Sequence, residues 1–138
     1  MTSNFILYQN YAIHYNETHL DLHNNFDFVG FSFDGIKREL KLNWVGTQAE
    51  WVLEDNPSKL TISIENVEYL KILPREDGVP FTEDSCLSDF TYYSSSERDE
   101  DGCVYYQEKP TTNDDIIFKF HSCQIIRVKG SSVNVEIE

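Results

Sequence analysis

The stretch LTISIENVEYLKIL, Leu60–Leu73, changes its hydrophobic rhythm twice. Apolar side chains alternate from Leu60 to Ile64, as they do in a strand with one buried face. The next apolar residues, Val67 and Leu70, each follow after a step of three, and alternation then resumes. Each three-residue step moves the apolar side chains to the other face of a strand. The pattern predicts a bent strand, or two short strands that meet at a corner after Ile64, with Val67 filling the corner.

The same pattern returns in IIFKFHSCQIIRV, Ile116–Val128, at a constant offset of 116 − 60 = 56 residues. All six apolar positions match, Val67 aligns with Cys123, and the basic residue Lys71 aligns with Arg127. A single repeat of this length is too long and too few for a solenoid. The two copies therefore predict two similar bent-strand units within one sandwich or barrel, with Cys123 packed at the second corner.

The rest of the chain also has the composition and the alternation of strands. Gly30 stands where the aromatic alternation of residues 26–33 shifts phase, which indicates a bulge, and Asp34-Gly35 indicates a hairpin turn. The strongest helix signal begins at Thr82 and lasts at most two turns. We expect one mostly β domain, residues 1–138, built as an antiparallel sandwich or a partly open barrel with at most one short helix.

The charge of the chain limits its partners. It carries 24 acidic and 11 basic side chains, a net charge of −13, which repels nucleic acid phosphates and anionic membrane surfaces. No apolar run approaches the roughly 20 residues of a membrane span. The first 15 residues lack the basic start and apolar run of a signal peptide. We therefore expect a cytoplasmic protein that binds neither nucleic acid nor membrane.

The acidic residues are concentrated between residues 76 and 101. This stretch holds nine acids and one base, 1 − 9 = −8. Tyrosine pairs lie within it and just after it, and because consecutive strand residues face opposite ways, one of each pair should be exposed. Exposed tyrosines beside carboxylates are typical of a protein-binding surface. The predicted surface comprises Glu76, Asp77, Glu83, Asp84, Tyr92, Tyr93, Glu97, Asp99, Glu100, Asp101, Tyr105 and Tyr106.

The sequence contains no recognised catalytic motif. It lacks GxSxG, HExxH, a phosphate-binding glycine loop and a dinucleotide fingerprint, so we expect no enzyme. His19, Asp21 and His23 would share one face of a strand, a spacing that can hold a metal ion. A solvated polar face with leucines on the opposite side explains the same spacing, so we predict no metal ligand and no cofactor.

In size, acidity, expected location and acid-plus-tyrosine segment, the chain resembles the bacterial immunity proteins that neutralise toxins. The resemblance is one of type, and no residue is carried over from it. It implies that the chain binds a basic protein partner, such as a nuclease toxin, by electrostatic steering and charge pairing. The alternative is a small β-barrel enzyme or ligand-binding protein with a pocket lined by Phe and Tyr.

Overall fold

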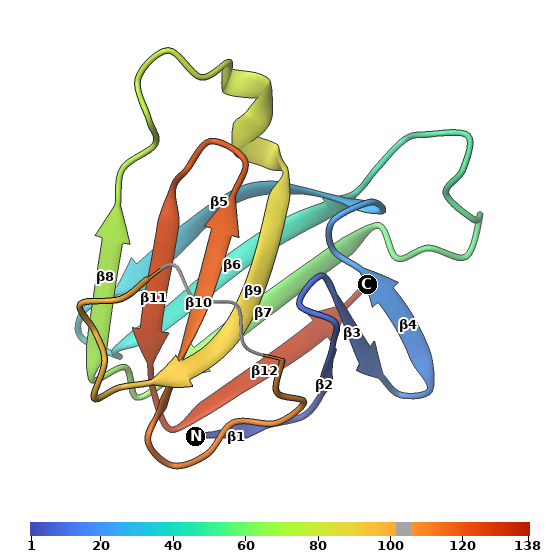
Figure 1. Ribbon diagram of the computed structural model, residues 1–138. Helices are drawn as coiled ribbons and strands as arrows, with labels where there is room; N and C mark the ends of the chain where they lie inside the picture. The colour runs from blue at the N-terminus through green and yellow to red at the C-terminus, as the bar shows by residue number, and fades with distance from the viewer. Residues whose placement is uncertain (102–105) are drawn as a thin grey trace.

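The computed structural model describes residues 1–101 and 106–138 (Figure 1). About half of this part of the chain is strand, and its one helix is the short 3-10 helix η1. The elements in chain order are β1 Thr2–Ser3, β2 Ile6–Tyr8, β3 Ala12–Tyr15, β4 Thr18–Asp21, β5 Phe26–Asp34, β6 Glu39–Gly46, β7 Lys59–Glu65, β8 Tyr69–Leu73, η1 Phe81–Ser85, β9 Leu87–Ser94, β10 Asp114–Phe120, β11 Ile125–Lys129 and β12 Ser132–Ile137. Within these two ranges, no helix has the length and apolar character needed to cross a membrane.

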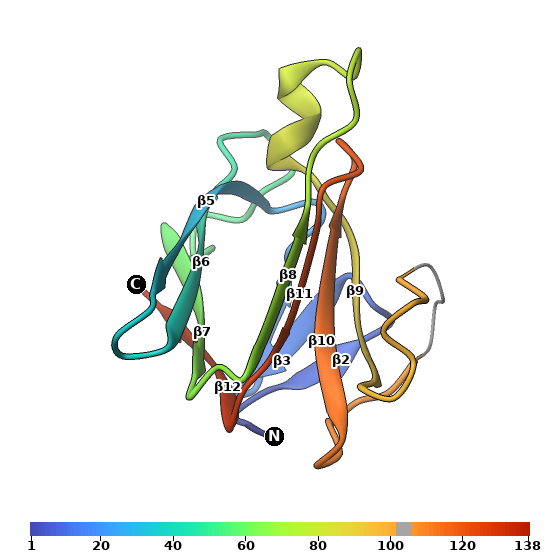
Figure 2. The same ribbon diagram turned by 90° about the vertical axis from the view of Figure 1, so that its left-hand side faces the viewer.

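Two sheets pack face to face as the layers of a sandwich (Figure 2). One sheet has the order β1-β12-β7-β6-β5, and the other has the order β8-β11-β10-β9. A third, small sheet of β2, β3 and β4 lies beside them and contributes Leu7, Ile13 and Leu20 to the same core. The predicted fold class, a mostly β sandwich, is confirmed. Its interior is filled by the alternating apolar side chains that the sequence pattern marked, including Leu60, Ile62 and Ile64.

The corner predicted after Ile64 is present. β7 belongs to one sheet and β8 to the other, so the chain changes layer between Glu65 and Tyr69. Asn66 takes a left-handed backbone conformation with φ of 51°, and Val67, 5% exposed, packs in the core at the bend. The two phase shifts in the sequence correspond to this change of layer.

The bent partner of this segment is not the aligned repeat but residues 125–137. β11 and β12 cross between the same two layers in the opposite direction, and they pair with β8 and β7 respectively. Two hydrogen bonds join the corners: Ser131 N donates to Glu65 O over 2.8 Å, and Glu68 N donates to Lys129 O over 2.9 Å. Gly130 is required between them, because a Cβ there would lie 2.3 Å from Glu65 O.

The prediction that the two copies follow similar paths is wrong. The second copy is a hairpin within one sheet, in which Ile116 pairs with Val128 across β10 and β11. Cys123 is exposed at its turn, with φ of 69°, and Ser122 is the buried residue there. A hairpin turn and a corner between layers both shift the strand phase. The pattern of apolar residues alone therefore does not distinguish them.

The predicted bulge and hairpin turn are present, whereas the helix signal at Thr82 corresponds to the 3-10 helix η1, which begins at Phe81 and has no side-chain cap. The pairing of β5 with β6 shifts register between Phe28 and Gly30, and Gly30 has φ of 136°, a conformation that favours glycine. The bulge turns Val29 outward, where it is exposed. The β5–β6 hairpin turns after Asp34, whose carboxylate accepts hydrogen bonds from the amides of Ile36 and Lys37.

Candidate functional site

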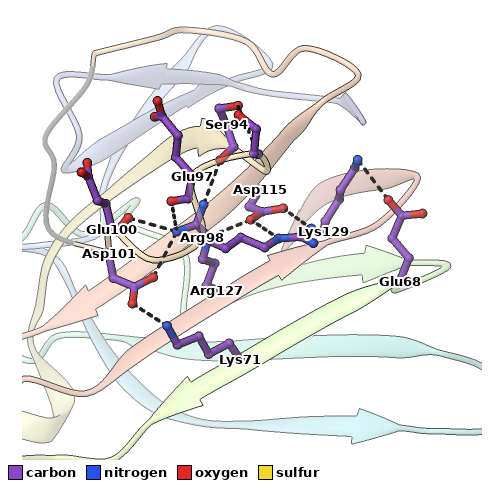
Figure 3. Close-up of polar contacts among 11 residues, drawn as sticks. Glu68, Lys71, Ser94, Glu97, Arg98, Glu100, Asp101, Asp115, Arg127 and Lys129 are labelled. Atoms are coloured by element: carbon purple, nitrogen blue, oxygen red, sulfur yellow. Dashed lines mark hydrogen bonds and ion pairs between the residues drawn. The ribbon is translucent and has the colours of Figure 1, made fainter.

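A fully buried arginine lies on the outer face of the β8-β11-β10-β9 sheet (Figure 3). Arg127 on β11 donates from Nε to Oδ2 of Asp115 on β10, over 2.7 Å, and neither side chain is accessible to solvent. Burial of two charges is costly unless they are paired and their remaining hydrogen-bonding groups are satisfied. The surroundings of Arg127 provide these partners.

The cover over Arg127 is the loop that follows β9. The guanidinium donates to the carbonyl oxygens of Ser94 at 3.0 Å, Glu97 at 3.4 Å and Glu100 at 3.0 Å. These bonds hold residues 94–101 against the sheet, as Figure 3 shows. This part of the predicted acidic surface is therefore fixed by its own backbone to a buried cation.

Asp101 closes the network at the end of this loop. Its carboxylate accepts from Lys71 Nζ at 2.7 Å and from Arg127 Nη1 at 3.1 Å. Burial would by itself raise the pKa of Asp101, but the hydrogen bonds and charges of Lys71 and Arg127 outweigh it and hold the pKa below its usual value. Asp101 is thus an internal partner rather than a surface acid.

Arg98, the one base of the acidic stretch, also faces inward. It binds Asp115 through two hydrogen bonds, of 3.0 and 2.9 Å, and its guanidinium carbon lies 3.6 Å from the centre of the Tyr69 ring. Bidentate arginine–carboxylate pairs are among the strongest hydrogen bonds in proteins. Arg98 therefore anchors the middle of the loop, as Arg127 anchors its two ends.

The predicted exposure of the tyrosines is wrong for the first pair. Tyr92 points into the core and is fully buried. Tyr93 is on the opposite face of β9, but the loop covers that face, so it is 6% exposed; its hydroxyl donates to Glu100 at 3.1 Å and its ring lies beside Arg127. Strand alternation gives the two directions correctly but does not reveal a loop folded over the outer face.

The second tyrosine pair is described only in part. Tyr105 lies outside the described residues. Tyr106 is about half exposed, and its hydroxyl lies 3.4 Å from the Glu108 carboxylate. Among the acids of the loop, Glu97, Asp99 and Glu100 remain exposed.

The other half of the predicted surface is the β8–β9 connection, at the top of Figure 1. Glu76 and Asp77 are exposed, whereas Glu83 and Asp84 in η1 are half-buried. The Glu76 amide donates to Ser122 O at 2.8 Å, which ties the connection to the β10–β11 turn.

An aromatic residue stands among these acids. Phe81 is 79% exposed, and Arg75 lies over its ring at 4.3 Å while donating from Nε to the Asp84 carboxylate at 3.0 Å. Arg75 is thereby neutralised, and Phe81 is held in place without being buried. Aromatic residues, Phe among them, are enriched at protein–protein interfaces relative to the rest of the surface.

An open hollow of about 350 Å³ lies next to η1. It is bounded by the bulge of β5, by Asp84 and by the β10–β11 turn. Its lining residues are Phe28, Val29, Gly30, Phe31, Asp84 and Gln124. The hollow is thus apolar on the side of the bulge and polar on the side of Asp84 and Gln124.

The predicted surface consists of two separate groups. Residues 76–84 lie before β9 and residues 97–101 lie after it, so the eight-residue strand separates them. At about 3.3 Å per residue, this strand of eight residues separates the groups by roughly 25 Å. The first group combines exposed acids, the 79% exposed ring of Phe81 and the hollow of about 350 Å³. Beside the second group lies a smaller hollow, of about 210 Å³, lined in part by Tyr93 and Glu97.

The structure does not bring His19, Asp21 and His23 together. β4 ends at Asp21, whose carboxylate accepts from the amides of His23 and Asn24 and turns the chain. His19 lies 2.9 Å from the ring of His14. His23 instead meets Cys86 and His121, and over the described ranges these three form a group of potential metal ligands that the sequence did not suggest.

Comparison with protein-family models, curated proteins and solved structures finds no match to this chain.

Proposed function

We propose that this protein binds and neutralises a basic protein toxin in the bacterial cytoplasm, as immunity proteins do. The observation that carries the proposal is the acidic and aromatic end of the sandwich at residues 76–84. There, the exposed Glu76 and Asp77 stand beside the exposed Phe81 and the hollow next to η1. We call this the η1 surface, comprising Glu76, Asp77, Phe81, Glu83, Asp84 and the hollow.

The charge of the η1 surface suits a basic partner. Of its four carboxylates, Asp84 is paired with Arg75, which leaves the charges of Glu76, Asp77 and Glu83 for a basic partner. The net charge of −13 would attract such a partner over distances of about the Debye length, ~8 Å at physiological ionic strength. The apolar side of the hollow would then receive an apolar side chain of the partner, surrounded by charge pairs.

The alternative, a ligand-binding barrel with an aromatic pocket, is less well supported. The aromatic residues that would line such a pocket fill the core instead, among them Phe5, Phe26, Phe90, Phe118 and Tyr92. The donors of Arg127 already bind acceptors of this chain, so they are not available to a ligand. The non-enzymatic reading is therefore the one that we propose.

The test uses two matched double variants. Glu76→Gln with Asp77→Asn changes the η1 surface, and Glu54→Gln with Asp55→Asn removes the same charges from an exposed Glu-Asp pair in the β6–β7 loop. Binding kinetics are measured against the purified product of the neighbouring gene at low and physiological salt.

We expect the η1 double variant to slow association severalfold at low salt, and the β6–β7 variant to have little effect. Phe81→Ala should mainly accelerate dissociation. If both double variants slow association equally, the effect comes from the net charge of the chain and not from contact with the η1 surface. Absence of binding by the unaltered chain would overturn the proposed function.

A further inference from the structure

Three side chains with metal-binding atoms converge beneath η1 from distant parts of the chain. His23 follows β4, Cys86 lies between η1 and β9, and His121 begins the β10–β11 turn. One ligand atom from each lies within 4.8 Å of the other two. The rings of His23 and His121 are 5.3 Å apart, and the Cys86 sulfur is 3.8 Å from His23 Nδ1.

The backbone fixes this convergence. His121 N donates to Cys86 O over 2.9 Å, which joins the β10–β11 turn to the residue after η1. His23 N donates to the Asp21 carboxylate over 3.0 Å, which sets the position of the first ring. Two of the three ligands are therefore joined directly, and the third is held by the turn after β4.

Each imidazole is oriented by an oxygen acceptor. His23 Nδ1 lies 2.6 Å from Leu87 O, and His121 Nδ1 lies 3.3 Å from the Glu83 carboxylate. His121, which can donate from Nδ1 to Glu83, keeps its lone pair on Nε2 for a metal ion. In His23 the nitrogen that lies 3.8 Å from the Cys86 sulfur is Nδ1 itself, so coordination through it replaces the contact with Leu87 O. Histidine ligands in metal sites are characteristically oriented by such carbonyl or carboxylate partners.

We propose that His23, Cys86 and His121 form a zinc-binding site. One thiolate and two imidazoles are ligands that Zn²⁺ prefers, and three protein ligands leave a fourth position for water. A thiolate sulfur and two imidazole nitrogens around a tetrahedral zinc ion are about 3.3–3.6 Å apart, so the three ligand atoms, now within 4.8 Å of one another, need to approach by about 1–1.5 Å. Side-chain rotation suffices, because His121 is exposed and the other two are half-buried.

The surrounding charge also favours a cation. Burial, and then the charges of Glu83 and Asp27, raise the pKa of the Cys86 thiol, so the thiol would lose its proton as the metal ion binds. Calcium would prefer an all-oxygen site, whereas the sulfur and nitrogen atoms here select a transition metal. The site is independent of the partner proposed above, since it requires only side chains of this chain.

The test is titration of the full chain, without a histidine tag, with Zn²⁺ and with Co²⁺. We expect one ion per chain, unaffected by excess Ca²⁺, and a charge-transfer absorption band from a cobalt–thiolate bond. Cys86→Ser should abolish this band, and His121→Ala should weaken binding at least about tenfold. Glu83→Gln should weaken it about 10–100-fold and retain the band.

Matched controls separate this site from its neighbours. Cys123→Ser removes the exposed thiol of the same β10–β11 turn, and His19→Ala removes an exposed histidine of the pattern His19, Asp21, His23. Both should bind as the unaltered chain does. Binding that is absent, that survives both Cys86→Ser and His121→Ala, or that is lost in Cys123→Ser would overturn the proposal. Circular dichroism confirms that each variant remains folded.

Discussion

Arg127 and Asp115 form a fully buried ion pair, with Nε and Oδ2 2.7 Å apart, on the outer face of a sheet that would otherwise face solvent. The pair is buried because residues 94–101 fold back over it and give the guanidinium three carbonyl acceptors. Two acids, Asp101 and Asp115, therefore serve to hold the loop in place. The exposed acids that remain are at the two ends of β9.

Removal of Asp115 should strongly destabilise the fold. Asp115→Ala leaves Arg127 buried with only Asp101 as a charged partner, and breaking a buried pair in this way costs about 3–5 kcal/mol. Urea denaturation should show the loss as a lower midpoint. The exposed Asp77→Ala should change the free energy of unfolding by no more than about 0.5 kcal/mol. A loss below about 1 kcal/mol in Asp115→Ala would contradict the buried network.

Stability should fall in acid partly through Asp101. Its pKa is lower in the folded chain than in the unfolded chain, so its contribution is complete above the unfolded value of about 3.9 and is lost as pH falls through the folded value. Asp101→Asn should therefore flatten the dependence of unfolding free energy on pH below about pH 5. Asp99→Asn, an exposed neighbour, is the control. Equal slopes for Asp101→Asn and the unaltered chain would refute this contribution.

The crossing of the two corners should be intolerant of any side chain at Gly130. Gly130→Ala would place a Cβ 2.3 Å from Glu65 O and 2.6 Å from Ile64 Cγ2, and the overlap with backbone should cost about 1–3 kcal/mol. Gly35→Ala is the matched control, because its Cβ would meet nothing nearer than the Phe33 ring at 3.8 Å. The midpoints of thermal unfolding of the two variants test this prediction. Equal midpoints would show that the backbone at the two corners can shift to make room for the added Cβ.

The sequence predicted those features of the fold that depend on local periodicity. The bend after Ile64, the bulge at Gly30 and the β5–β6 hairpin each leave a mark within a few residues of the chain. The partner of the bent strand, residues 125–137, could not be found in this way. Pairing depends on which sheet each strand joins, and both possibilities bury the same apolar positions.

The candidate site was less accessible to sequence reasoning. Arg127 interrupts the apolar run IIRV, residues 125–128, which is a signal that its charge could be buried. A buried arginine needs a charged partner, so the same signal implies a nearby buried carboxylate. His23, Cys86 and His121 are far apart in the chain, so no spacing rule connects them. The three meet only because the turn after β4, the end of η1 and the β10–β11 turn lie at one end of the sandwich.

The two aligned corner residues, Val67 and Cys123, should differ in their contribution to stability. Val67 packs in the core where the chain changes layer, so Val67→Ala leaves a cavity and should cost about 1–3 kcal/mol. Cys123 occupies the same place in the sequence pattern but is exposed at a hairpin turn, so Cys123→Ala should change stability by less than about 0.5 kcal/mol. Urea denaturation of the two variants under reducing conditions measures the difference. Similar losses of unfolding free energy in the two variants would contradict this difference. They would mean that Cys123 contributes to packing as Val67 does, as the sequence alignment of the two copies implies.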